Sequence, residues 1–433
     1  MGMGGHAGGL DLGQILSSLQ NCPCGREHTT QIEQIIVESG AAVRLGALLC
    51  QFHFPKTLLL VADKNTLAAA EGVLQSLDEW GFVVKPQIFD DLRTADMREV
   101  ELIEALSAEV GGILSVGSGS NNDICRLASA RAGKDLCIFA TAASMDGFAS
   151  DAAPITYNNF KHSYPARQPR LLIADTAILA AAPKELKSAG FGDMMGKYIG
   201  LADWRVAHLL IGEYYCPRVA ALTKQAADRI FALAGRITEQ DEEAAAEVFE
   251  ALVLTGLGMG FTHNSRPASG AEHVVSHFWE CKKLEHSLVS DFHGKKVGVA
   301  TLACMKIYGR LAETKEILPV REQIDWDEVY SAYGEVLSEA VRPLHDPTTT
   351  EKITTEKLKE AWPEIRRVIK ELPPYEAMRA AFAQAGAAAE KEEIGVDAKL
   401  FAQGFRFSPF MRDRLTLLRL LPMLQKDWEE LYG

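Results

Sequence analysis

Four residues in the second half of the sequence have the types and spacing needed to bind a metal and move a proton. His273 and His277 stand four residues apart and therefore share one face of a helix. Asp193 lies among glycines and apolar residues at the expected start of a helix, and His293 precedes a flexible glycine. One carboxylate with two or three imidazoles around a divalent ion, leaving a position open for substrate, makes a catalytic rather than a structural site.

Each of these residues also has an ordinary structural explanation. A carboxylate at a helix start is stabilised by the helix dipole, which accounts for Asp193 without any metal. A single histidine is more often a hydrogen-bonded structural residue than a ligand. The zincin motif H-E-x-x-H is not matched, because Glu272 precedes His273 instead of following it.

Two turns at the ends of expected strands are candidates for binding a dinucleotide. Gly117–Asp123 (GSGSNND) follows a strand and opens a helix, so its glycines admit a phosphate while the helix N-terminus supplies amide donors. The segment lacks the third glycine of G-x-G-x-x-G and the Gly-Lys-Ser/Thr ending of a P-loop, so a plain strand-to-helix turn remains an alternative. Thr141–Ser150 (TAASMDGFAS) is a second, hydroxyl-rich loop after the next strand.

The elements that position these residues suggest an α/β protein with two domains. Apolar runs such as Leu58–Val61 and Ile113–Val116 alternate with helical stretches, which indicates βαβ units and a mainly parallel sheet. Beyond Pro183 the pattern becomes helical throughout. We therefore predict a Rossmann-like dinucleotide-binding domain over residues 1–182 and an all-helical metal- and substrate-binding domain over residues 183–433, with the active site in the cleft between them.

Composition excludes several classes of function. Forty-five Lys and Arg against 58 Asp and Glu give a net charge of −13, without a basic stripe, so nucleic-acid binding is not expected. The N-terminus lacks the features of a secretory signal, and no run approaches about 18 uninterrupted apolar residues, so we expect a cytoplasmic protein without membrane insertion.

The eight cysteines are scattered through a chain too large to need disulfides, which fits a reducing compartment. Cys22 and Cys24 with nearby His28 form the one suggestive cluster. Two cysteines and one histidine leave a structural zinc site one ligand short, so we expect an N-terminal turn there.

Taken together and in order, five segments resemble the sn-glycerol-1-phosphate dehydrogenases, in their longer bacterial form, within the iron-containing alcohol dehydrogenase and dehydroquinate synthase-like superfamily. The segments are GSGSNND, TAASMDGFAS, GFGDMMGKYIGLADW, SRPASGAEHVVSH and FHGKKVG, spread over residues 117–298. The resemblance implies a cytoplasmic homodimer that interconverts dihydroxyacetone phosphate and sn-glycerol 1-phosphate with NAD(P)(H), a reaction that serves phospholipid biosynthesis.

The resemblance also implies roles for individual residues. Asp193, His273 and His293 would bind the divalent metal, Asp193 and His277 would be catalytic, and both would contact substrate together with Asp146. The dinucleotide contacts would be Gly117, Ser118, Gly119, Ser120, Asn121, Thr141, Ala142, Ala143, Ser144 and Ser150. One carboxylate and two imidazoles accommodate zinc, nickel or iron without a clear preference.

Asp63 is the residue that bears on the choice of cofactor. It follows the strand Leu58–Val61, where an adenosine ribose is expected if the turn at Gly117 holds the pyrophosphate. A carboxylate there accepts hydrogen bonds from the ribose of NAD and repels the 2′-phosphate of NADP, so we predict a preference for NADH over NADPH. The alternative is that Asp63 only caps the following helix.

Three other functions remain to be weighed. A polyol dehydrogenase of the same superfamily would share the fold, metal and cofactor, and a phosphate pocket would distinguish the two. Arg266, Lys295 and Lys296 lie close to the motif histidines, but they are equally explained as surface or ion-pair residues. A non-catalytic relative would have no reason to keep three ligands together, and a dehydroquinate synthase-like lyase would retain NAD as a recycled cofactor.

Overall fold

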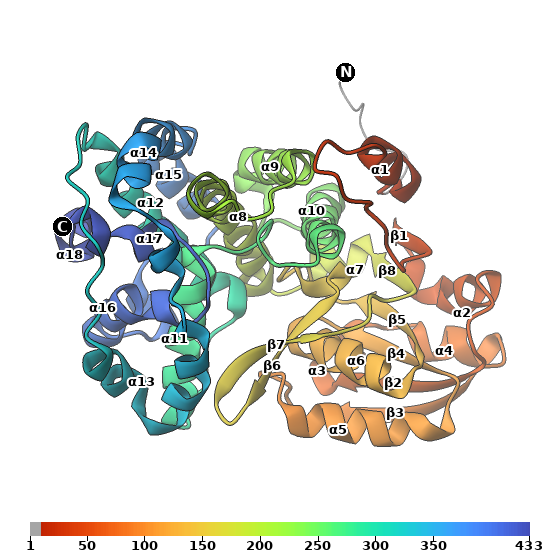
Figure 1. Ribbon diagram of the computed structural model, residues 1–433. Helices are drawn as coiled ribbons and strands as arrows, with labels where there is room; N and C mark the ends of the chain where they lie inside the picture. Colours follow the sequence, from red (N-terminus) through yellow and green to blue (C-terminus); the bar gives the residue numbers. More distant parts are fainter. Residues whose placement is uncertain (1–9) are drawn as a thin grey trace. The chain divides into compact units, whose positions relative to one another are not determined.

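The computed structural model describes residues 10–433, and its contacts divide the chain into two units (Figure 1). The sheet unit comprises the described part of Met1–Tyr157 together with His162–Gly190 and Arg236–Asn264. The helical unit comprises Asn158–Lys161, Phe191–Gly235 and Ser265–Gly433. The division is therefore not a single cut near residue 182, because one later helical segment groups with the sheet.

That segment is α10 (Glu242–Thr262), which is apolar on nearly all sides. It packs against α7 (Thr176–Ala181) and the short 3₁₀ helix η2 (Gly147–Ala149), where the Phe148 and Phe249 rings meet edge to face with centroids 5.0 Å apart. Within residues 10–433, α10 alone has the length and hydropathy of a membrane span, but 94% of its apolar window is buried in the protein. Such burial is typical of the core helix of a globular domain.

A six-stranded sheet with parallel pairing throughout forms the sheet unit, in the order β1-β8-β5-β4-β2-β3. Its strands are β1 (Gln34–Glu38), β2 (Thr57–Asp63), β3 (Val83–Phe89), β4 (Gly112–Gly117), β5 (Asp135–Ala140) and β8 (Leu171–Asp175). The order reverses between β2 and β4, since β3 lies beyond β2 whereas β5 and β8 continue on the other side of β4. Ligands bind at the carboxyl ends of strands at such a reversal.

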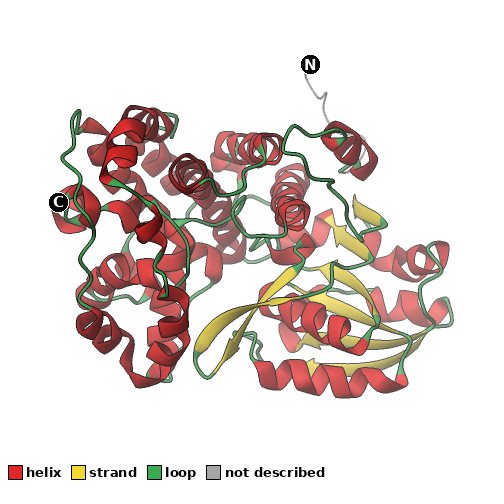
Figure 2. Ribbon diagram, in the orientation of Figure 1, coloured by secondary structure: helices red, strands yellow, loops and turns green. Residues whose placement is uncertain are grey.

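Burial on both faces explains why these strands read as nearly continuous apolar runs. Every residue of β4 and of β8 is buried. The sheet unit also contains α1 (Leu12–Leu19), α2 (Ala41–Gln51), α3 (Lys64–Ala69), α4 (Val73–Glu79), α5 (Met97–Leu106) and α6 (Gly119–Ala132). Figure 2 shows the yellow strands interleaved with these red helices, which confirms the predicted α/β class.

The structure contains one small sheet that was not predicted from the sequence, and one strand of the large sheet ends in a helix cap. β6 (Ala152–Tyr157) and β7 (Phe160–Pro165) form a separate two-stranded sheet that the sequence analysis did not foresee. The last strand of the large sheet, β8, stops at Asp175, which caps α7 by accepting a hydrogen bond from the backbone N–H of Ala177. Capping competes with strand extension because the carboxylate satisfies an amide at a helix start.

Helices make up nearly all the regular structure of the helical unit, as predicted. They are most of α8 (Lys184–Ile211), then α9 (Pro217–Ala232), α11 (Ala271–Glu285), α12 (His293–Glu313), α13 (Trp326–Val341), α14 (Thr355–Lys370), α15 (Tyr375–Gln384), α16 (Ala398–Phe407), α17 (Leu417–Leu420) and α18 (Trp428–Tyr432). Three of these helices, α8, α11 and α12, carry the residues predicted to bind metal.

Candidate active site

Asp193 projects from the interior of α8, nine residues after its first residue, Lys184. The expectation that Asp193 stands at a helix start is therefore wrong. The glycines that suggested a helix boundary instead permit close packing: a Cβ at Gly192 would collide with the backbone carbonyl of Gly294 in α12. This close approach brings Asp193 to the first residue of α12, His293.

The three predicted metal ligands come together. One ligand atom from each of Asp193, His273 and His293 lies within 4.8 Å of the other two. The Nε2 atom of His273 is 3.5 Å from Oδ1 of Asp193, and the rings of His273 and His293 have centroids 5.1 Å apart. A carboxylate and two imidazoles at this spacing fit a divalent transition metal with positions left for a substrate.

Glu272 fixes which nitrogen of His273 faces the cluster. Its Oε1 atom accepts a hydrogen bond from Nδ1 of His273 at 2.6 Å, and its carboxylate also accepts from the backbone N–H of Gly270. Burial lowers the pKa of His273, but the carboxylates of Asp193 and Glu272 outweigh it and raise that pKa to about 9. A carboxylate on the outer nitrogen of a ligating histidine sets the tautomer and strengthens the ligand.

Lys197 lies one helical turn from Asp193, and both side chains are completely buried. Its Nζ atom is 2.7 Å from Oδ1 of Asp193. Burial raises the pKa of Asp193, but the Lys197 ammonium and the neighbouring histidines hold it below its ordinary range, so the carboxylate remains charged as a metal ligand must be. Lys197 was not among the residues predicted from the sequence, although its spacing of four residues from Asp193 indicates such a pair.

His277 lies beside the two ligating histidines, with ring centroids 6.2 Å from His273 and 5.6 Å from His293. Burial, reinforced by the Lys161 ammonium, lowers its pKa well below the ordinary value of 6.5. His277 is therefore a neutral imidazole at physiological pH.

A group of charged side chains surrounds His277 in the helical unit. Glu280 pairs with Lys161 at 2.8 Å and with Lys296 at 2.9 Å, while Arg412 donates to the backbone carbonyl of Lys161. Although burial raises the pKa of Glu280, the two lysines lower it well below its usual range. Three cations accompany one carboxylate, so the group carries a positive excess suited to an anion. No local pattern signals this group, because Lys161 and Arg412 lie far apart in sequence.

The neighbouring basic residues singled out from the sequence have structural partners. Arg266 is buried and pairs with Glu213 through Nε at 2.6 Å and through a second, short contact from Nη2. Lys295 pairs with Asp291 at 2.9 Å. Of the three candidates, only Lys296 belongs to the charged group around His277.

In the sheet unit, the turn after β4 has the form predicted for a phosphate site. Gly119 has a φ of +46°, which favours glycine, and a Cβ at Gly117 would stand only 3.0 Å from the Asn121 amide. Ser118 is the N-cap residue of α6, but its hydroxyl pairs with that of Ser144 at 2.7 Å instead of capping the helix. The first amides of α6 thus lack a side-chain cap, as expected where a phosphate binds.

The side chains of Ser120 and Asn121 hold this turn in place. The amide nitrogen of Asn121 donates to the carbonyl of Val61 and to Ser115, at 3.0 and 2.9 Å, and the side chain is 2% exposed. Ser120 donates to the carbonyl of Arg93. Asn121 therefore ties the turn after β4 to β2, so these side chains support the turn from the protein side.

Asp63 ends β2, the strand that pairs with β4, so its position beside the Gly117 turn agrees with the sequence analysis. Its carboxylate accepts a hydrogen bond from the backbone N–H of Thr66 at 2.8 Å, in a reciprocal capping box at the start of α3. The adjacent Lys64 pairs with Asp90. The helix-capping role is thus present, and it occupies one carboxylate oxygen, Oδ1.

The loop after β5 completes the predicted dinucleotide region. Thr141 donates its backbone N–H to the carbonyl of Gly117 at 3.2 Å, so the two predicted turns lie together. Arg126, which the sequence analysis missed, is fully buried and donates to the carbonyls of Ser150 and Ala152 at 2.9 and 2.7 Å. Ala142, Ala143 and Asp146 lie in the same buried loop. Its backbone is therefore fixed by hydrogen bonds to α6 and β4.

Known proteins resemble the chain over most of its length. The iron-containing alcohol dehydrogenase family model matches residues 36–183. A glycerol-1-phosphate dehydrogenase (NAD(P)+) from Geobacillus stearothermophilus is 31% identical over 95% of this chain and 97% of its own. A second from Halalkalibacterium halodurans is 34% identical over 68% of this chain and 75% of its own.

A solved structure, sulfoacetaldehyde reductase from Bifidobacterium kashiwanohense in complex with NAD+, resembles the fold. Its TM-score is 0.60 at 15% identity, with 94% of this chain and 96% of that chain covered. At this identity the likeness concerns the fold alone.

Proposed function

The chain belongs to the glycerol-1-phosphate dehydrogenase family, and from this membership we propose that it reduces dihydroxyacetone phosphate to sn-glycerol 1-phosphate with NAD(P)H and a divalent metal. The observation that carries the proposal is the convergence of Asp193, His273 and His293, whose ligand atoms all lie within 4.8 Å of one another. The uncapped glycine turn at Gly117–Gly119 supports the dinucleotide part.

The residues divide into those that hold the metal and those that orient the ligands. Asp193, His273 and His293 would hold the ion, while Glu272 keeps Nε2 of His273 directed at it. When bound, the metal supplies Lewis-acid polarisation of the substrate carbonyl, and the nicotinamide supplies the hydride. Gly117, Ser118, Gly119 and Ser144 shape the site for the pyrophosphate.

His277 handles the proton of the substrate hydroxyl. Because it is neutral, it can accept the alcohol proton in the oxidation direction. In the reduction direction it must first take a proton from solvent, and the imidazolium so formed then gives that proton to the substrate oxygen. Its place one helical turn from His273 keeps it near the metal ligands without making it one. Asp146, in the loop after β5, is the second proposed substrate contact.

The positive group around His277 would bind the substrate phosphate. Lys161, Lys296 and Arg412 provide three cations against the single carboxylate of Glu280. A phosphate dianion gains from such an excess, whereas an uncharged glycerol does not. This group favours a phosphorylated substrate over the free polyol of a glycerol dehydrogenase, and the intact ligand cluster argues against a non-catalytic relative.

Several finer points remain proposals that the family supports. NADH is the preferred cofactor, with NADPH also used, because Asp63 stands where the adenosine ribose is expected. Zinc and nickel suit the ligand set, and iron is possible chemically. A cytoplasmic homodimer whose product enters phospholipid biosynthesis completes the proposal. The sheet unit would bind the dinucleotide, and the helical unit the metal and substrate.

The test is NADH oxidation by the purified protein with dihydroxyacetone phosphate, dihydroxyacetone and a heptulosonate phosphate as alternative substrates. We expect turnover only with dihydroxyacetone phosphate, and chiral analysis should identify the product as sn-glycerol 1-phosphate. Preference for the unphosphorylated ketone would instead indicate a polyol dehydrogenase, and phosphate release from the heptulosonate would indicate a lyase.

Asp193→Asn, His273→Ala and His293→Ala test the metal site directly. Each should lose bound metal and turnover while the helical circular dichroism signal persists, because the ion does not nucleate a core of this size. Lys295→Ala is a control, since Lys295 pairs with Asp291 outside the ligand set. Retention of metal and normal turnover in all three ligand variants would contradict the assignment.

A further inference from the structure

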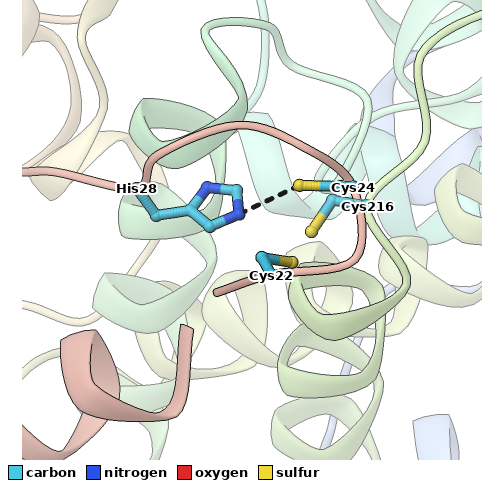
Figure 3. A group of neighbouring side chains, drawn as sticks. All are labelled: Cys22, Cys24, His28 and Cys216. Carbon is cyan, nitrogen blue, oxygen red and sulfur yellow. Dashed lines mark hydrogen bonds between the residues drawn. The ribbon is translucent and has the colours of Figure 1, made fainter. Parts of the chain in front are cut away.

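A second cluster of metal-binding side chains shares no residue with the Asp193 site. Figure 3 shows Cys22, Cys24, His28 and Cys216 gathered around one point. One ligand atom from each of these residues lies within 4.8 Å of the other three. In the sequence, Cys22, Cys24 and His28 are one ligand short of a structural zinc site, and Cys216 supplies the missing ligand from a position 188 residues beyond His28.

Local structure presents the first two thiols together. The backbone N–H of Gly25 donates to the carbonyl of Cys22 at 3.1 Å, which closes a turn with Pro23 at its second position. Gly25 has a φ of +77°, a conformation that favours glycine. The N-terminal turn predicted from the sequence is therefore present, and it places Cys22 and Cys24 on the same side of the chain as His28 (Figure 3).

The spacing fits a tetrahedral ion. With metal–sulfur bonds of about 2.3 Å and metal–nitrogen bonds of about 2.0 Å, the edges of a zinc tetrahedron are roughly 3.5 to 3.8 Å long. The observed separation between Sγ of Cys24 and Nε2 of His28 is 3.3 Å. All four ligand atoms lie within 4.8 Å of one another, close to the separation of the corners of such a tetrahedron.

The orientation of His28 points to a metal rather than to a structural histidine. Its Nδ1 atom lies 3.0 Å from the backbone carbonyl of Phe261. A carbonyl only accepts hydrogen bonds, so Nδ1 carries the proton and the lone pair of Nε2 faces Cys24. A carbonyl on one nitrogen and the ligand lone pair on the other is the arrangement found in metal-ligating histidines.

Cys216 is prepared for the charged thiolate form by its place in the fold. It is completely buried as the N-cap residue of α9, and its sulfur accepts a hydrogen bond from the backbone N–H of Val219 at 3.5 Å. The N-terminus of a helix of 16 residues favours negative charge at this position.

We propose that Cys22, Cys24, His28 and Cys216 bind one Zn²⁺ ion in a closed structural site. Three sulfurs and one imidazole nitrogen fill a tetrahedron, so no position is left for a substrate or water, in contrast to the Asp193 site. A disulfide between two of the cysteines would use neither the third cysteine nor the histidine lone pair. The four residues are separate from the Asp193 ligands, so the ion plays no part in turnover.

The first measurement is the metal content of the purified, full-length protein by mass spectrometry. We expect two metal equivalents per chain for the wild type and one for Cys24→Ser and for Cys216→Ser, with turnover unchanged in both variants. His293→Ala should also lose one equivalent, but from the catalytic site and together with activity. Cys50→Ser, at a cysteine outside the cluster, should retain both equivalents.

The second measurement uses Co²⁺ as a probe and needs no variant, so it remains informative if a cysteine variant fails to fold. Cobalt-loaded wild type should show intense visible bands and a thiolate-to-cobalt charge-transfer band near the ultraviolet, which an Asp-His-His site cannot produce. One metal equivalent in the wild type without thiolate bands would overturn the proposal, as would a disulfide among Cys22, Cys24 and Cys216 in protein purified without oxidation.

Discussion

Glu272→Gln tests whether a side chain that does not touch the metal controls its binding. Gln has nearly the same shape as Glu, so the variant removes a charge without opening a cavity. In the wild type, Oε1 of Glu272 accepts from Nδ1 of His273 at 2.6 Å, and the side chain is completely buried. The glutamine oxygen can still accept this hydrogen bond, but the glutamine NH2 group then takes the place of Oε2. The NH2 group and the backbone N–H of Gly270 are both donors, so they cannot form a hydrogen bond with each other.

The size of the effect follows from the nature of this hydrogen bond. Bonds to buried charged groups are worth about 1.5 to 3 kcal/mol, and outer partners of metal-ligating histidines contribute about 10- to 100-fold to metal affinity. Because Gln keeps an acceptor, we expect the lower part of that range. The free metal concentration that half-restores turnover should rise about 10-fold, with kcat at saturating metal reduced less.

The assay is titration of buffered Zn²⁺ or Ni²⁺ into the metal-depleted enzyme, followed by NADH oxidation. Turnover reports only the Asp193 site, so metal bound elsewhere does not interfere. Glu322→Gln is the matched control, because Glu322 is also a buried glutamate but pairs with Arg419. It should lower stability without moving the metal titration. An unchanged half-saturating concentration in Glu272→Gln would refute the idea that Glu272 sets the ligand form of His273.

Four further outcomes are expected. His277→Gln should retain metal and lose about 100-fold or more in kcat, and loss of metal instead would make His277 a ligand. The pKa of His277 is lower in the folded protein than its ordinary value of 6.5 in the unfolded chain, so the unfolded chain takes up a proton first as the pH falls. The wild type should therefore lose thermal stability between about pH 6.5 and 5 more steeply than His277→Gln. Asp63→Ser keeps an N-cap residue, so it should cost about 1 kcal/mol of stability or less. It should nevertheless lower the NADH-to-NADPH ratio of kcat/KM several-fold by improving the use of NADPH. The reason is that a carboxylate about 4 Å from the 2′-phosphate opposes NADPH binding by roughly 4 kcal/mol before screening. An unchanged ratio would leave Asp63 as a helix cap only. Gly192→Ala places a Cβ against the Gly294 carbonyl, so it should lower the free energy of unfolding by about 1 to 3 kcal/mol and also weaken metal binding. The control is Gly309→Ala, whose Cβ would meet nothing within 4 Å and which should not destabilise the protein in thermal unfolding.

Local patterns in the sequence were sufficient for the fold class and for much of the candidate site. Strands buried on both faces leave continuous apolar runs, so β2 and β4 were located from their residues alone. The spacing of His273 and His277 predicted a shared helix face because helical geometry is set by the backbone. The glycine turn at Gly117–Gly119 was likewise visible, since a positive φ, as at Gly119, restricts the choice of residue.

Tertiary structure decided the features that depend on contacts between distant segments. Asp193 was misplaced at a helix start because glycines mark both helix ends and close helix packing, and only the approach of Gly294 distinguishes the two. The cations around His277 come from segments more than 250 residues apart, Lys161 and Arg412.

The same reason explains the second metal cluster. A sequence reveals ligands that are neighbours along the chain, so Cys22, Cys24 and His28 were recognised as a set. It gives no sign of a ligand that is distant along the chain, as Cys216 is from the other three residues of the group. The sequence by itself determined three of the four ligands, and the tertiary structure supplied the fourth, which turns an N-terminal turn into a candidate zinc site.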